Sequence, residues 1–106
     1  MPVRREKWDP AWGPFTEAAM RKRLEAEGYS VSRYTYPPGT YFSEHTHPID
    51  KKDTVIRGRL KITSAGKEFV LEAGDLVEIP AGAPHTAEVL GSETVVSFDA
   101  TRPPRE

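Results

Sequence analysis

Two stretches decide the fold of this chain: GTYFSEHTH at residues 39–47 and GDLVEIPAGAPH at residues 74–85. All 3 histidines of the chain, His45, His47 and His85, fall in these stretches. Because side chains along a strand repeat with a period of two, His45 and His47 point to one face. Imidazole suits zinc, iron, copper and nickel as a ligand, so the pattern predicts a metal site.

Short segments with strand character surround both stretches. From residue 29 onward, glycine, proline and aspartate punctuate the chain at regular intervals. Short strands separated by such turns are typical of an all-β sandwich or barrel. A bend is expected at Gly58, which interrupts a long strand. The strands are predicted at residues 30–36, 41–45, 54–62, 67–71, 76–79, 85–89 and 94–99.

The first part of the chain differs in character from the rest. Residues 1–15 read as an irregular arm with three large aromatic side chains. The segment 17–27 is predicted to be a helix, because its apolar residues recur at helical spacing. Within one domain, the chain is therefore expected to divide into an arm and helix (1–28), a barrel (29–101) and a flexible tail (102–106).

The composition excludes several classes of function. The 15 basic and 16 acidic residues leave a net charge of -1, unlike the basic balance of nucleic-acid-binding proteins. With 0 cysteines, disulfides, thiolate ligands and cysteine nucleophiles are excluded. The sequence shows neither a signal peptide nor an apolar run long enough to span a bilayer, so a cytoplasmic protein without a membrane partner is expected. The lack of Asn and Gln beside many charged residues is typical of thermophilic proteins.

Both histidine stretches resemble the two signature motifs of the cupin superfamily. The first motif is Gly, five residues, His-x-His, three or four residues, Glu, six residues, Gly; it fits from Gly39 to Gly58. The second is Gly, five residues, Pro-x-Gly, two residues, His, three residues, Asn; it fits from Gly74 to His85, with Val89 where Asn is common. The resemblance implies a small, single-domain bacterial cupin: an all-β double-stranded β-helix, or jelly-roll barrel, with a short N-terminal helix.

One position departs from the family pattern. Where the family has its metal-binding glutamate, this chain has Lys51, whose ammonium group would repel a cation. The resemblance leaves three outcomes: a metal held by the histidines alone, Lys51 acting as a neutral amine beside the ion, or a site that binds metal poorly. A solvated Lys51 in weak pairs with its charged neighbours is an equally good interpretation.

Other polar residues near the first motif are candidates of lower rank. Tyr41 shares strand parity with the first histidine, so it is predicted either to line the pocket as a catalytic residue or to belong to the barrel core. Asp50 and Asp53 are spare carboxylates that a shifted loop would bring to a metal, although a surface position is expected for each.

The resemblance implies a range of functions. Three imidazoles on one divalent transition metal (iron, manganese, nickel, copper or zinc) leave coordination positions open, as catalytic sites do. The first hypothesis is a metal-dependent enzyme, a dioxygenase or an isomerase, in which Lys51 orients or protonates a small anionic substrate. The alternative is a non-catalytic module that binds or senses a small ligand through a degenerate metal site. A homodimer is expected, with Trp8 and Trp12 of the arm reaching the neighbour.

Overall fold

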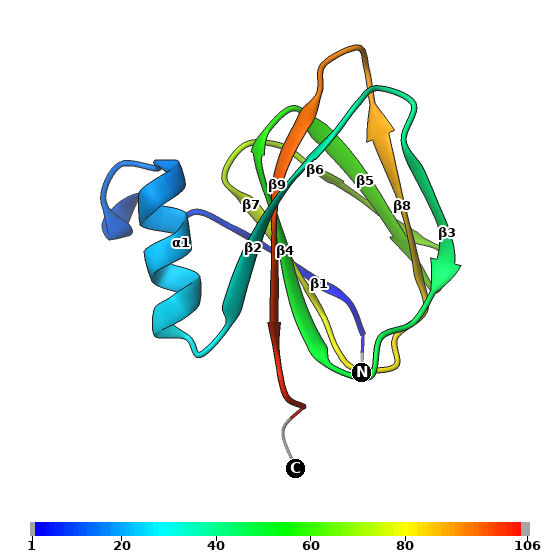
Figure 1. The fold of residues 1–106 in the computed structure, drawn as a ribbon, viewed down its shortest axis with the longest axis horizontal. Coiled ribbons are helices and arrows are strands. Elements are labelled where there is room, and N and C mark those ends of the chain that lie inside the picture. Colours follow the sequence, from blue (N-terminus) through cyan, green and yellow to red (C-terminus); the bar gives the residue numbers. More distant parts are fainter. Residues whose placement is uncertain (1, 105–106) are drawn as a thin grey trace.

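The strands of this chain pair into two antiparallel sheets that face each other. The computed structural model describes residues 2–104. Its strands are β1 (Arg4–Lys7), β2 (Ser30–Tyr36), β3 (Tyr41–His45), β4 (Asp50–Arg57), β5 (Arg59–Ser64), β6 (Lys67–Leu71), β7 (Asp75–Ile79), β8 (His85–Leu90) and β9 (Val95–Arg102). One sheet has the order β1-β7-β4-β9-β2 and the other the order β3-β8-β5-β6, which gives the predicted jelly-roll barrel (Figure 1).

Gly58 turns the chain from one sheet to the other. It lies between β4 and β5, where the sequence predicts a bend, and its φ of 86° is in the left-handed region that favours glycine. A Cβ at this position would lie 3.0 Å from the backbone oxygen of Thr94 and 3.1 Å from Cα of Val95. The corner of the barrel therefore requires glycine at position 58, because there is no room for a side chain.

The helix α1 (Glu17–Ala26) covers the outer face of the five-stranded sheet (Figure 1). The Thr16 side chain caps it by accepting a hydrogen bond from the backbone N–H of Ala19 at 3.0 Å. Met20 and Leu24 are fully buried against Leu76 and other residues of the sheet. The predicted helix is present and covers a face of the sheet. No helix within residues 2–104 combines the length and apolar character needed to cross a membrane.

Two apolar clusters hold these layers together. The inner cluster fills the space between the sheets and includes Val55, Ile62 and Val77, all fully buried. The outer cluster joins the helix to the other face of the same sheet through Phe98 and Ala100, also fully buried. The central strands β4 and β9 are therefore covered on both faces.

The arm does not remain irregular, contrary to the sequence expectation. Arg4–Lys7 forms β1 and pairs with β7, with Arg4 opposite Glu78. All 4 residues of the segment are charged, so it shows no apolar alternation from which a strand could be predicted. The aromatic rings that follow pack on their own chain: the ring centroid of Trp8 lies 5.2 Å from that of Trp12 and 5.6 Å from that of Phe15.

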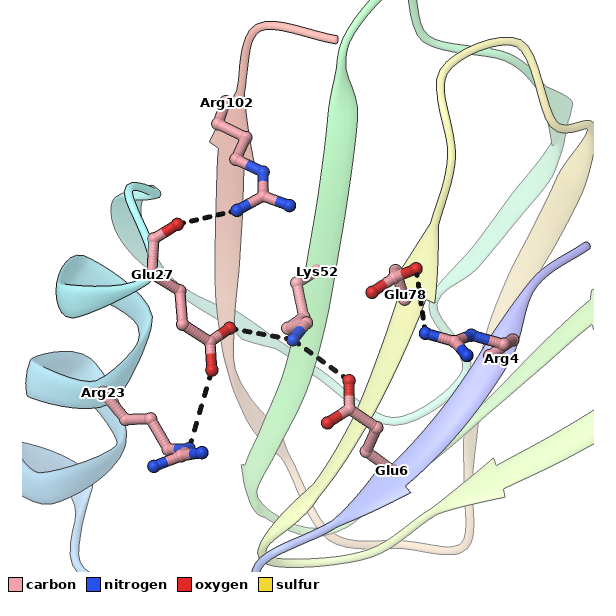
Figure 2. Close-up of polar contacts among 7 residues, drawn as sticks. All are labelled: Arg4, Glu6, Arg23, Glu27, Lys52, Glu78 and Arg102. Carbon is pink, nitrogen blue, oxygen red and sulfur yellow. Dashed lines mark hydrogen bonds and ion pairs between the residues drawn. The ribbon is translucent and has the colours of Figure 1, made fainter. Parts of the chain in front are cut away.

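The start of the expected tail is also ordered structure. Arg102 is the last residue of β9, and its guanidinium donates a hydrogen bond to the backbone oxygen of Glu27 at 2.7 Å. Beside it, the buried Lys52 of β4 lies 2.9 Å from the Glu27 carboxylate and 3.0 Å from that of Glu6 (Figure 2). These contacts join the helix end, β1, β4 and β9. Residues 105 and 106 of the expected tail lie outside the described residues.

Candidate metal centre

The barrel brings the three histidines together at one end of the four-stranded sheet. His45 is the last residue of β3 and lies opposite His85, the first residue of β8. His47 follows two residues beyond the strand. One ring nitrogen from each of the three lies within 4.8 Å of the others, which is close enough to hold a single ion. The ring centroids are 4.3–5.3 Å apart.

Backbone carbonyls fix the orientation of two of these rings. Nδ1 of His45 lies 2.6 Å from the Ser43 oxygen, and Nδ1 of His85 lies 3.0 Å from the Ala83 oxygen. A carbonyl oxygen can only accept, so each Nδ1 carries the hydrogen and each Nε2 keeps a free lone pair. Nε2 of His47 is buried and has no hydrogen-bond partner among residues 2–104. A cation that accepts electron pairs fits this set of nitrogens.

The surroundings keep the imidazoles in the form that binds metal. Burial lowers the pKa of His47, and the positive charge of Lys51 lowers it further. Burial also lowers the pKa of His85, although the hydrogen bond to the Ala83 carbonyl acts in the opposite direction. Both rings therefore resist protonation as the pH falls, and a neutral ring is the metal-binding form.

The histidines open into a cavity of about 170 Å³ between the two sheets. Its lining combines the histidines and polar residues of β4 and β9 with several apolar or aromatic residues. The residues that share the lining with the histidines are Tyr36, Phe42, Lys51, Asp53, Leu60, Ala87, Ser97 and Asp99.

Lys51 faces this cavity, so the interpretation as a solvated surface residue is wrong. Its side chain is 8% exposed, and Nζ lies 3.0 Å from Oδ1 of Asp99 and 3.5 Å from Oδ1 of Asp53. Burial acts to lower the pKa of Lys51, but the two carboxylates outweigh it and the pKa is raised. Lys51 is therefore an ammonium ion, which argues against its acting as a neutral amine.

Asp53 is the most strongly perturbed acid of the cavity. Burial raises its pKa to about 7, the nearby charge of Asp99 raises it too, and Lys51 acts against both. Asp53 and Asp99 lie directly opposite each other on β4 and β9. The pKa of the Asp53 carboxyl group thus lies close to neutral pH. The surface position that the sequence predicts for Asp53 is incorrect.

Tyr41 does not line the cavity. The residue is 59% exposed. A register shift in β3 between Phe42 and His45 breaks the alternation on which the prediction depends. Phe42 lines the cavity instead, with its ring centroid 5.1 Å from that of Tyr36. Asp50 is directed elsewhere, because its carboxylate accepts a hydrogen bond from the backbone N–H of Ala81 at 2.8 Å.

Sequence reasoning missed the contribution of β9. Ser97 and Asp99 alternate with buried apolar residues and so share one face of that strand. An aspartate at such a position is a signal for a polar interior site. The sequence does not reveal that β9 pairs with β4, and this pairing is what sets Asp99 against Asp53.

The family model described as a cupin domain matches residues 32–100, which include all of these cavity residues. The chain belongs to the cupin family. Among curated proteins, none matches this cupin.

Solved structures agree with the cupin fold. A DUF861 family protein from Thermotoga maritima is 24% identical, with 95% of this chain and 100% of that chain covered and a TM-score of 0.63. A protein with a double-stranded β-helix domain from Klebsiella pneumoniae is 26% identical, with 73% and 65% covered and a TM-score of 0.63. Acireductone dioxygenase from Bacillus anthracis, with a cadmium ion in its active center, is 20% identical, with 93% and 77% covered and a TM-score of 0.65.

Proposed function

We propose that this cupin binds one divalent transition metal through His45, His47 and His85 and acts as a metal-dependent enzyme, oxygenase-like, on a small organic molecule. The observation that carries the proposal is the convergence of three imidazoles, with ring nitrogens within 4.8 Å of one another, in the lining of one cavity. Three protein ligands leave positions for other ligands, as in catalytic metal sites. When bound, the metal supplies Lewis-acid or oxygen-activating chemistry.

The residues of the chain prepare the site for such chemistry in separate ways. The backbone oxygens of Ser43 and Ala83 hold two histidine rings with Nε2 free. The carboxyl group of Asp53, whose pKa is raised to about 7, is able to hold or release a proton at neutral pH. Phe42 and Tyr36 add an aromatic surface to the cavity lining, with their ring centroids 5.1 Å apart.

The named relatives support the proposal only in outline. One is a dioxygenase with a metal ion in its active center, and another, 24% identical with a TM-score of 0.63, is an oxalate decarboxylase. At these identities the likeness concerns the fold, which hosts many reactions. The residues of the cavity therefore carry the functional argument.

The direct test is metal content measured by mass spectrometry on protein purified without an affinity tag or a chelator. We expect near-stoichiometric transition metal in the wild type. His47→Ala should reduce metal affinity by at least about 10–100-fold, because one of three ligands is lost. The far-ultraviolet circular dichroism of this variant should stay native, since His47 lies outside the apolar clusters.

Thr46→Ala is the matched control, because Thr46 is exposed and lies between the two histidines of the first motif. It should keep the full metal content. Wild-type protein that is free of metal and also rejects added iron, manganese, nickel, copper and zinc would refute the enzyme proposal. Full occupancy in His47→Ala would refute the ligand assignment.

A further inference from the structure

The polar groups around the cavity are mostly hydrogen-bond acceptors. Nε2 of His45 and of His85 carries a lone pair, because Nδ1 of each ring donates to a backbone oxygen. The Oδ1 atoms of Asp53 and Asp99 are buried and have no hydrogen-bond partner among residues 2–104. Nζ of Lys51 lies 3.0 Å from Oδ1 of Asp99 and 3.5 Å from Oδ1 of Asp53, but one ammonium group cannot fill all the acceptor positions of two carboxylates. Buried acceptors of this kind are stabilised by a ligand that brings a donor.

The donors of the cavity are largely engaged already. The ammonium group of Lys51 is held by two carboxylates, and the Ser97 hydroxyl donates to the Thr54 backbone oxygen at 2.9 Å. Among the described lining residues, the remaining side-chain donors include the hydroxyl of Tyr36, whose pKa burial and the nearby carboxylates raise to about 12, and the single N–H of a neutral His47 ring. A ligand that offers only acceptors therefore meets few free donors.

The wall of the cavity that β4 and β9 form carries Lys51, Asp53 and Asp99. Its charge also disfavours an anion. Lys51, Asp53 and Asp99 carry one positive and two negative charges when both acids are ionised, which leaves one negative charge. A carboxylate ligand beside them would add like-charge repulsion in a partly buried site. In the metal-free protein, Lys51 therefore offers little positive charge to an anionic ligand, because two carboxylates already engage it.

The size and the apolar side of the cavity restrict the rest of the ligand. Tyr36, Phe42, Leu60 and Ala87 make up the apolar and aromatic part of the lining. The volume of about 170 Å³ is close to that of an engineered cavity of roughly 150 Å³ that binds benzene. One six-membered ring with a short substituent matches this space.

We propose that the cavity recognises a neutral, ring-sized molecule that carries a hydroxyl group, which donates to the carboxylates of Asp53 and Asp99 while the ring lies against Tyr36 and Phe42. The proposal rests on the proposed function in that it names the substrate class of the same cavity. Recognition of the hydroxyl is a property of the wall formed by β4 and β9, so it is testable without metal.

The test compares two probes of nearly equal size on chelator-treated, metal-free protein at about pH 8, where an acid with a pKa near 7 is ionised. Benzyl alcohol presents a hydroxyl donor and benzoate presents an anionic acceptor. Their dissociation constants are measured by the chemical-shift changes of backbone amides on titration. We expect benzyl alcohol to bind at least about tenfold more tightly, as one hydrogen bond to a charged group predicts. Equal affinity, tighter binding of benzoate, or no binding of either probe would overturn the proposal.

Variants of the two aspartates test whether the preference for benzyl alcohol over benzoate comes from the wall formed by β4 and β9. Asp53→Asn and Asp99→Asn should each bring the two affinities closer together, because each removes a negative acceptor. Glu93→Gln makes the same change of net charge at an exposed position outside the cavity. It should leave the ratio of the dissociation constant of benzoate to that of benzyl alcohol unchanged. A ratio that stays unchanged in both aspartate variants would overturn the assignment. If an aspartate variant fails to fold, Lys51→Met takes its place, because it keeps both carboxylate acceptors. This variant should raise the ratio of the two dissociation constants. A lower ratio would contradict the proposal.

The two proposals fail separately. A preference for benzyl alcohol in a protein that rejects every metal would refute the metal-dependent function and leave hydroxyl recognition intact. A metal-loaded protein whose metal-free form prefers benzoate would refute hydroxyl recognition and leave the metal site intact.

Discussion

At Lys51 the chain has a cation where the family motif has a ligand carboxylate. Two aspartates on the inner face compensate: Asp99 at 3.0 Å and Asp53 at 3.5 Å from Nζ. The three charges sum to one negative charge when both acids are ionised, which equals the charge of a single glutamate. The exchange therefore preserves the electrostatic balance of the cavity for a cation bound at the histidines, while it removes a fourth ligand.

Asp53 should impose a pH dependence on the stability of the metal-free protein. Its pKa is raised from 3.8 to about 7 in the fold, so between these values the native state holds a proton that the unfolded state releases. Its contribution to the free energy of unfolding is thus present below about pH 4 and lost as the pH rises through 7. In urea unfolding, the stability of Asp53→Asn relative to the wild type should increase over this range.

Glu93→Gln is the control, because it makes the same change of charge at an exposed position outside the cavity. Burial lowers the pKa of His47 and His85, so their contributions to the free energy of unfolding increase as the pH rises, opposite to that of Asp53. The comparison with the wild type at each pH cancels these histidine contributions. A difference for Asp53→Asn that stays constant from pH 4 to about pH 8 would contradict the assigned pKa.

At the level of elements, strand β3 shows what sequence patterns can and cannot predict. The spacing of His45 and His47 correctly predicts that they meet, because both lie after the register shift. The same period-two rule fails for Tyr41, which lies before the shift. A bulge adds a residue without any mark in the sequence, so alternation is reliable only over an uninterrupted ladder. Phe42 therefore lines the cavity in its place.

The turn at Gly58 allows a sharp test of how the two sheets are joined. Gly58→Ala should destabilise the protein by more than the roughly 1–2 kcal/mol that a left-handed conformation costs an L-residue, because its Cβ would also press on the backbone of Thr94 and Val95. Gly39→Ala is the matched control: its φ is 84°, but a Cβ there meets nothing within 4 Å. Chemical denaturation measures both. Equal losses would show that the corner relaxes without cost.

Across the whole molecule, the sequence predicts the inner barrel better than its outer covering. Motif spacing and turn residues locate the strands that carry the histidines, and the structure has strands at each predicted segment. The outer layer depends on contacts between distant segments, such as Lys52 with Glu6 and Glu27 (Figure 2). Charged residues at these positions look like ordinary surface residues in the sequence, because nothing local indicates that β1 and the helix end will cover them.

The arm offers a test at this largest scale, because β1 closes one edge of the five-stranded sheet. Deleting residues 1–7 would leave the backbone groups of β7 that face β1 without partners and would expose the edge to other chains. It would also remove Val3, which is 8% exposed and whose burial is worth about 1.5–3 kcal/mol. We expect a lower melting temperature and self-association that rises with protein concentration in sedimentation velocity.

Side-chain variants of β1 separate the strand pairing from its ion pairs. Arg4→Ala and Lys7→Ala remove the contacts with Glu78 and Asp75 but keep the backbone of β1 in place. Exposed ion pairs contribute about 0–1 kcal/mol, so these variants should sediment as the wild type does and melt close to it. If they associate as strongly as the truncated protein, charge on the arm protects the sheet edge; if only the truncation associates, the backbone of β1 protects it.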